Sequence, residues 1–124
     1  MEERIVAIRG AIQVVEDSPA AIEEGVERLY HAICMANTLI EEQMISLIFS
    51  ITNDLKSFNP ATALRRSYPA FGVPLFCTQE ASIEGMLPRT IRILIHCYST
   101  QAEVHHIYLE GARSLRSDLN NNYS

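Results

Sequence analysis

The chain of 124 residues has no tryptophan, few cysteines and no long hydrophobic run. Its longest apolar stretch, residues 44–51, is far shorter than the roughly 20 residues that cross a bilayer, so no membrane partner is expected. Residues 1–4 lack the cationic flank and apolar run of a signal peptide. An odd number of cysteines without a C-x-x-C pair, Cys34, Cys77 and Cys97, favours reduced thiols and a cytoplasmic location.

Motifs for the common kinds of catalysis are also missing. There is no Gly-rich dinucleotide motif, no P-loop and no nucleophile elbow, so neither nucleotide chemistry nor serine hydrolysis is expected. The histidines His31, His96, His105 and His106 lack the spacing of metal ligands, and we expect no metal or other cofactor. The formal net charge of −5, without a run of Lys and Arg, argues against a nucleic-acid partner.

The sequence does contain the composition and periodicity of one globular domain. Hydrophobic residues make up 48% of the chain and charged residues 20%, an ordinary balance for a folded protein. Runs of alternating or continuous aliphatic residues predict five strands, at residues 4–10, 44–52, 73–78, 90–97 and 106–109.

Two helices are predicted between these strands. Ser18 followed by Pro19 is a strong helix start, and an apolar stripe continues from Ile22 to Ile40, interrupted by Asn37. A second, short helix over residues 61–67 follows an Asn-Pro pair and cannot continue into the next proline. This order predicts an α+β fold, in which two helices cover one face of a mixed sheet of about five strands.

We assign residues 1–116 to this domain and expect residues 117–124 to form a flexible polar tail. Two helices cannot cover both faces of such a sheet. The second face would stay in contact with water unless a partner covered it, so we expect an oligomer.

Four polar side chains occur in segments that otherwise look like buried strands: Arg9, Glu80, Arg92 and Tyr108. A guanidinium among branched aliphatic residues is costly to desolvate unless an anion or several acceptors contact it. One explanation is a structural ion pair, such as Arg92–Glu80 or Arg9–Glu110. The other is a bound anionic ligand, which would make these residues a functional site.

Five motifs occur in order along almost the whole chain, and they contain all four residues. They are Ile8-Arg9-Gly10-Ala11; Thr52-x-Asp54-Leu55 followed by Pro60-Ala61-x-Ala63-x-Arg65; Val73-Pro74-Leu75-x-Cys77-x-Gln79-Glu80; Gly85-x-Leu87-Pro88-Arg89-x-Ile91-Arg92; and His106-x-Tyr108-Leu109-Glu110 with Leu115-Arg116-x-Asp118-Leu119. Together they resemble the monofunctional, trimeric class of chorismate mutase, with a slightly short connection between Cys97 and His105.

The resemblance implies a homotrimer that forms a pseudo-α/β barrel, with three active sites in the clefts between neighbouring subunits. It implies conversion of chorismate to prephenate, the shikimate-pathway branch step toward phenylalanine and tyrosine. This reaction is an intramolecular Claisen rearrangement. It requires no covalent or acid–base step and no cofactor, only selection of the reactive conformer and electrostatic stabilisation.

The resemblance also implies roles for individual residues. Arg92 would donate to the ether oxygen, and Glu80 would accept a hydrogen bond from the ring hydroxyl. Arg9 and Tyr108 would hold the carboxylate of the enolpyruvyl side. Further substrate contacts are implied for Leu75, Phe76, Cys77, Thr78, Asn59, Ala61, Thr62 and Leu115, with Arg65 and Arg116 as peripheral cations.

The chain departs from the family pattern near the predicted pocket mouth. Asn59 stands where phenylalanine is common, Thr62 where lysine is common, and Phe76 where a small hydroxyl residue is common. These departures keep open a second function, a non-catalytic trimeric module that binds a small dicarboxylate. A third alternative is an imine-hydrolysing enzyme of a similarly shaped trimeric family, against which Glu80 and Arg92 in their motifs argue.

Overall fold

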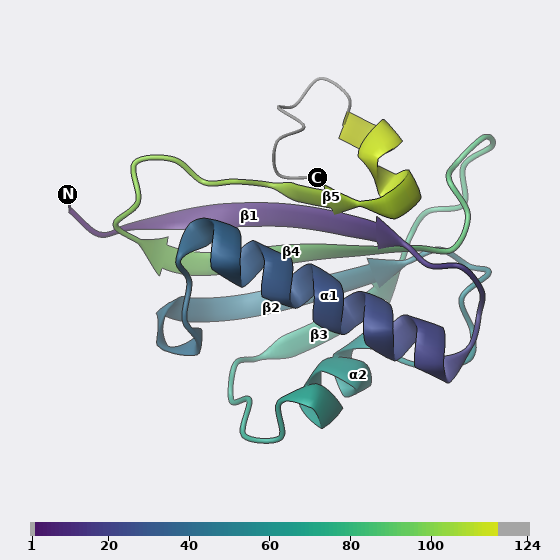
Figure 1. The fold of residues 1–124 in the computed structure, drawn as a ribbon, viewed down its shortest axis with the longest axis horizontal. Coiled ribbons are helices and arrows are strands. Elements are labelled where there is room, and N and C mark those ends of the chain that lie inside the picture. Colours follow the sequence, from purple (N-terminus) through teal and green to yellow (C-terminus); the bar gives the residue numbers. More distant parts are fainter. Residues whose placement is uncertain (1, 117–124) are drawn as a thin grey trace.

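A computed structural model describes residues 2–116, in which five strands form one sheet and two helices lie on one of its faces (Figure 1). The predicted tail, residues 117–124, lies outside the described residues. None of the described helices combines the length and apolarity that a membrane span needs. In chain order the elements are β1 (Arg4–Gln13), α1 (Pro19–Asn37), η1 (Glu41–Gln43), β2 (Met44–Ile51), α2 (Pro60–Ser67), β3 (Leu75–Gln79), β4 (Thr90–Ser99), β5 (Ile107–Leu109) and η2 (Glu110–Arg116), where η1 and η2 are 3-10 helices.

The strands are ordered β3-β2-β4-β1-β5 in the sheet. The central strand β4 is antiparallel to both β1 and β2, whereas β3 runs parallel to β2 and β5 parallel to β1. Side chains alternate along β4 as the sequence predicts: Ile91, Ile93 and Ile95 are buried, while Arg92 and Leu94 are partly exposed. The predicted α+β class and the mixed five-stranded sheet are therefore confirmed.

Helix α1 supplies most of the apolar layer that covers the sheet. The Ser18 hydroxyl caps its first turn by accepting a hydrogen bond from the Ala21 N–H at 3.1 Å. The helix ends at Asn37, and the next residue, Thr38, adopts a left-handed conformation with φ of 49°. The predicted continuation to Ile40 is wrong: the chain has left the helix there, and the Ile40 side chain is 56% exposed.

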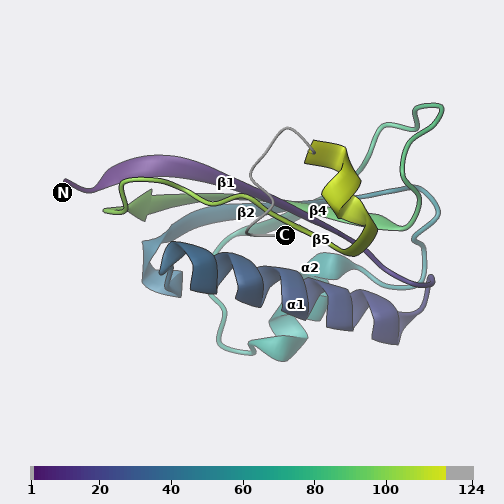
Figure 2. The ribbon, with the colours of Figure 1, turned by 45° about the horizontal axis from the view of Figure 1, so that its top comes forward.

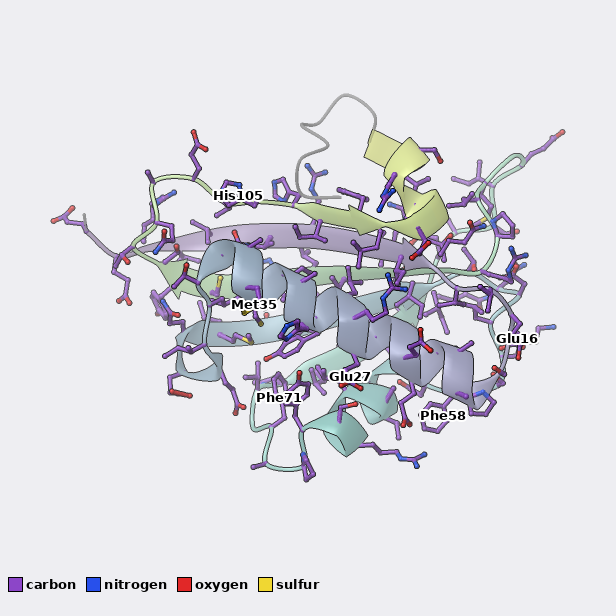
Figure 3. The ribbon with its side chains drawn as sticks, in the orientation of Figure 1. Glu16, Glu27, Met35, Phe58, Phe71 and His105 are labelled. Atoms are coloured by element: carbon purple, nitrogen blue, oxygen red, sulfur yellow. The ribbon has the colours of Figure 1, made fainter. Side chains whose placement is uncertain are left out.

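Asn37 is buried in the apolar stripe because its side chain joins α1 to the segment before β5. Its amide donates to the carbonyl oxygens of Ile33 (2.9 Å) and His105 (3.0 Å), and its Oδ1 accepts from the His105 N–H at 2.7 Å. His105 lies on the segment before β5, which passes the end of α1 (Figure 3). The polar residue in the helical stripe is thus a cross-link between two distant segments, with its hydrogen-bonding groups satisfied.

The two faces of the sheet are covered unequally. Figure 2 shows α1 and α2 on one side and η2 on the other. Helix η2, which the sequence analysis did not predict, covers only one end of the second face, where Ala112 and Tyr108 pack against Ala11. Elsewhere this open face carries the exposed aromatic side chains of Phe76 and Tyr98, which no other part of the described chain covers.

The Thr52-x-Asp54 motif fixes the loop that leads into β4. The Thr52 hydroxyl accepts from the buried Thr90 N–H (3.0 Å) and donates to Asp54 Oδ1 (2.6 Å). Asp54 in turn accepts from the Arg89 N–H, where the backbone is left-handed with φ of 50°. These bonds hold the start of the strand that carries Arg92.

Candidate active site

An open hollow of about 360 Å³ lies on the exposed face of the sheet. It brings together the four polar residues singled out in the sequence, which come from β1, β4, β5 and the end of β3. The chain pairing explains this, because Ala11 of β1 is paired with Arg92 on one side and with Tyr108 on the other. The lining residues are Arg9, Gly10, Ile48, Ser50, Glu80, Arg92, Ile93, Leu94 and Tyr108.

Arg92 and Glu80, which both line the hollow, form an ion pair. The distance from Arg92 Nε to Glu80 Oε1 is 3.4 Å, and the two side chains are 40% and 30% exposed. A structural ion pair therefore accounts for one of the contacts of the Arg92 guanidinium. The contact is made through Nε, and a planar guanidinium carries further N–H donors on its two terminal nitrogens, which a ligand in the hollow could use.

Strand β2 binds both the backbone and the side chain of Glu80. Its backbone N–H donates to the Ile51 carbonyl at 2.7 Å, and its Oε1 accepts from the Ser50 hydroxyl at 2.6 Å. Ser50 was not among the site residues predicted from the sequence. A small polar residue inside an aliphatic strand was the signal, but its partner depends on the position of β3 in the sheet.

Arg9 lies on β1 where the backbone approaches its neighbours closely. A Cβ atom on the adjacent Gly10 would lie 2.8 Å from Ile33 Cδ1 and 3.0 Å from the Ile107 carbonyl oxygen, so glycine is needed for this packing. The alternative explanation for Arg9, an ion pair with Glu110, is not found among the described residues. Glu110 contacts Arg28 of α1 instead, at 2.8 Å, and the Arg28 guanidinium lowers the pKa of that carboxyl from its usual value.

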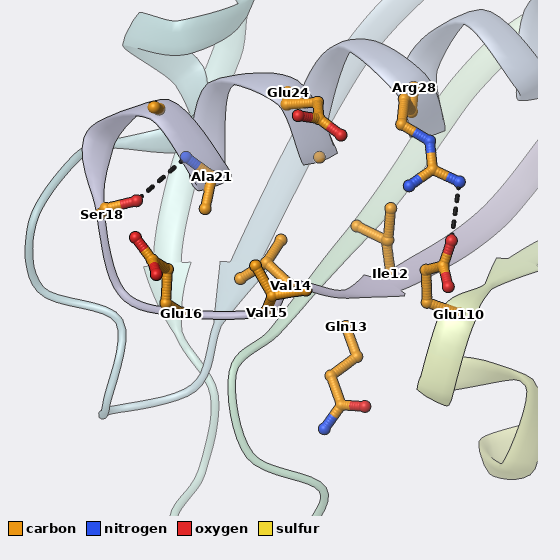
Figure 4. A pocket seen from close by; sticks show the side chains of 12 residues that line it. Ile12, Gln13, Val14, Val15, Glu16, Ser18, Ala21, Glu24, Arg28 and Glu110 are labelled. Atoms are coloured by element: carbon orange, nitrogen blue, oxygen red, sulfur yellow. Dashed lines mark hydrogen bonds and ion pairs between the residues drawn. The ribbon is translucent and has the colours of Figure 1, made fainter.

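The Arg28–Glu110 pair borders a second hollow, of about 430 Å³, between the start of α1 and the end of β1 (Figure 4). None of the predicted site residues lines it. The pair joins α1 to the first residue of η2, the helix that packs on Tyr108. The pair therefore links α1 to the residue that follows β5.

The other predicted substrate contacts do not all reach the first hollow within one chain. Phe76 and Thr78 share the open face with Arg92, whereas Leu75 and Cys77 point toward the helices, where burial raises the pKa of the Cys77 thiol. Leu115 packs in the small cluster around Tyr108, and the side chain of Arg116 lies outside the described part of the structure. The remaining residues belong to the start and body of α2, on the opposite side of the sheet: Asn59, Ala61, Thr62 and Arg65.

Asn59 has a structural role within its own chain, as the N-cap residue of α2. Its Oδ1 accepts a hydrogen bond from the Ala61 N–H at 2.8 Å and so caps α2, which a phenylalanine there would not do. The neighbouring Phe58 lies beside α2 (Figure 3), where its ring carries the Arg66 guanidinium 5.5 Å above its centre. Both residues therefore stabilise the helix end within this chain.

Comparisons with known proteins agree with the resemblance that the sequence motifs indicated. The family described as chorismate mutase type I matches residues 5–119. The chain is 40% identical over 115 residues to the chorismate mutase AroH of Thermus thermophilus, covering 90% of this chain and 93% of the relative. It is 32% identical over 114 residues to chorismate mutase AroH of Bacillus subtilis (strain 168), covering 90% of each.

A solved structure shows the same architecture. The chorismate mutase from Clostridium thermocellum superposes with a TM-score of 0.83 at 32% sequence identity, covering 88% of this chain and 98% of the other. The likeness therefore extends over nearly the whole fold, including the sheet that carries the hollow.

Proposed function

The chain belongs to the chorismate mutase type I family, and we propose that it isomerises chorismate to prephenate in the hollow on the open face of its sheet. This activity belongs to the biosynthesis of the aromatic amino acids. The observation that carries the assignment of the site is the convergence of Arg9, Glu80, Arg92 and Tyr108 on one hollow. Two cations and two polar groups in this arrangement match a substrate that carries two carboxylates, a hydroxyl and an ether oxygen.

Arg92 is assigned to the ether oxygen. Negative charge grows on this oxygen as its bond to carbon lengthens, so a fixed cation there binds the transition state more tightly than the substrate. One preplaced donor of this kind supplies about 3–4 kcal/mol, or roughly 10²- to 10³-fold in rate. The partial exposure of Arg92 and the engagement of Nε alone by Glu80 leave it able to do this.

Arg9 and Tyr108 are assigned to the carboxylate of the enolpyruvyl side. Chorismate is flexible, and it reacts only from a compact chair that brings two distant carbons together. Donors held on a rigid sheet select that conformer and remove rotational freedom before the reaction begins. A total acceleration of about 10⁶ requires about 8 kcal/mol, so this orientation must add to the effect of Arg92.

We also propose that the working unit is a homotrimer with its sites between subunits. Within one chain, the sheet separates the hollow from the α2 residues Asn59, Thr62 and Arg65. A neighbouring copy that presents its α2 and β3 edge to the hollow would complete the site. The same contact would cover the apolar side chains of the open face, such as Phe76.

A cytoplasmic location is proposed from the cysteines. Cys34, Cys77 and Cys97 are all free thiols in the structure. Burial raises the pKa of the Cys34 thiol to about 11, which makes it a weak nucleophile. Free, unreactive thiols suit a reducing compartment.

The test is to mix the purified protein, at micromolar concentration, with chorismate and to follow the loss of its absorbance. Prephenate formation is expected, and its absence would refute the proposed activity. Thermal stabilisation by chorismate without turnover would instead indicate the alternative function, a non-catalytic module that binds a small dicarboxylate.

A further inference from the structure

Ser50 lines the hollow together with Glu80 and Arg92. It is paired across the sheet with Arg92 on β4 and with Thr78 on β3, on the face that the hollow occupies. Its hydroxyl donates to Glu80 Oε1 at 2.6 Å, and the same oxygen is 3.4 Å from Arg92 Nε. The shorter contact to this carboxylate oxygen is therefore the one to the hydroxyl.

Without the hydroxyl, the arginine would be the main partner of Glu80. Carboxylates and guanidinium groups prefer a bidentate pair, in which two N–H groups bind both carboxylate oxygens. Such a pair would use the donors that the ether oxygen needs. It would also occupy the carboxylate oxygen that accepts from the ring hydroxyl.

We propose that Ser50 is a positioning residue that keeps Glu80 and Arg92 in a loose, single contact. The hydroxyl holds Oε1, which leaves Oε2 for the ring hydroxyl of the substrate and the terminal N–H groups of Arg92 for the ether oxygen. This proposal rests on the proposed roles of Glu80 and Arg92.

The local structure suits this role. The Glu80 backbone is anchored to Ile51 and its carboxylate to Ser50, so consecutive residues of β2 hold both ends of the residue. Strand β2 lies inside the sheet, between β3 and β4, where the ladder keeps its backbone in place. Ser50 is only partly exposed, which shelters its hydrogen bond from water.

The experiment measures kcat and KM of the full-length protein with chorismate. A hydrogen bond to a charged group supports a fall in kcat of about tenfold for Ser50→Ala, with a smaller change in KM, because the loss acts on the transition state. Ser50→Thr keeps the hydroxyl and a strand-forming side chain, and its kcat should stay within about threefold of wild type. A Thr variant as slow as Ser50→Ala would overturn the role of the hydroxyl.

Ser46→Ala is the matched control. Ser46 lies on the same strand and face, but its hydroxyl is 3.2 Å from His96 Nδ1 and it does not line the hollow. Its removal should leave kcat and KM unchanged. Equal losses in Ser46→Ala and Ser50→Ala would mean a general weakening of β2 and would contradict the proposal.

A double-mutant cycle with Glu80→Ala separates positioning from structural damage. If Ser50 acts through Glu80, Ser50→Ala should cause no further loss in the Glu80→Ala background. Losses that multiply would overturn the proposal, as would a Ser50→Ala enzyme with wild-type kcat. An inactive wild-type protein, by contrast, would count against the proposed activity itself.

Discussion

The backbone N–H of Arg9 donates to Nδ1 of the His106 ring at 3.0 Å. The imidazole nitrogen thus accepts a hydrogen bond from a β1 N–H group that would otherwise donate to a carbonyl oxygen of the neighbouring strand. The sequence predicted that this strand starts at His106, whereas β5 begins at Ile107. The side-chain contact of His106 accounts for the difference. The contact also joins the backbone of Arg9 to the segment that leads into the strand carrying Tyr108.

Arg92→Ala should lower kcat by at least about two orders of magnitude, because it removes the charge assigned to the ether oxygen. Steady-state assay with chorismate measures the loss. Arg4→Ala is the control and should turn over like wild type, since Arg4 lies at the start of β1, donates to the carbonyl oxygens of Gln101 and Ala102 and does not line the hollow. An Arg92→Ala enzyme with wild-type turnover would remove Arg92 from its proposed role.

Phe76→Asp should disrupt the proposed trimer. Phe76 is 67% exposed in the single chain and lies on the open face of the sheet, where a neighbouring subunit would bury a carboxylate at high cost. Sedimentation analysis of the variant should show smaller species than wild type.

Met35→Asp is the comparison for this variant, because Met35 is 69% exposed on α1, in the helix layer that covers the other face of the sheet (Figure 3). It should assemble like wild type. A wild-type protein that sediments as a monomer would contradict the shared site.

Asn37→Ala should destabilise the fold by about 1–3 kcal/mol. The substitution removes the three hydrogen bonds by which the buried Asn37 side chain joins α1 to the segment before β5. Urea unfolding at one fixed protein concentration measures the change. His31→Ala, at an exposed position of the same helix, should stay within about 0.5 kcal/mol of wild type.

Asp17 should make stability depend on pH in the acid range. Hydrogen bonds from the Ser57 hydroxyl and N–H, and from the Lys56 N–H, lower the pKa of Asp17 below its usual 3.8. A lowered pKa contributes stability that is fully present above the unfolded value and is lost as the pH falls through the folded one. Asp17→Asn should therefore melt lower than wild type at pH 7, and the difference should vanish in strong acid.

Thermal melts of both proteins across this range test the prediction for Asp17. Glu42→Gln, at an exposed position in η1, is the control and should melt like wild type at each pH. A difference between Asp17→Asn and wild type that persists unchanged in acid would show that the carboxylate charge is not the cause.

The sequence predicted those features that depend on neighbouring residues. The alternation of Ile91, Arg92 and Ile93 placed the arginine on the open face, and Ser18 with Pro19 marked the start of α1, as the structure confirms. The end of α1 was missed because the apolar stripe continues beyond the turn at Thr38. Helix η2 was missed because its short segment has no periodic apolar pattern.

By itself, therefore, the sequence determined the class of fold, the motifs of the family and four of the residues that line the hollow. Only the tertiary structure decided the partners of those residues. Ser50 contacts Glu80 across 30 residues of sequence, and Glu110 pairs with Arg28, 82 residues away, rather than with Arg9. Such contacts follow from the strand order β3-β2-β4-β1-β5 and from the packing of α1, and local periodicity carries no information about either.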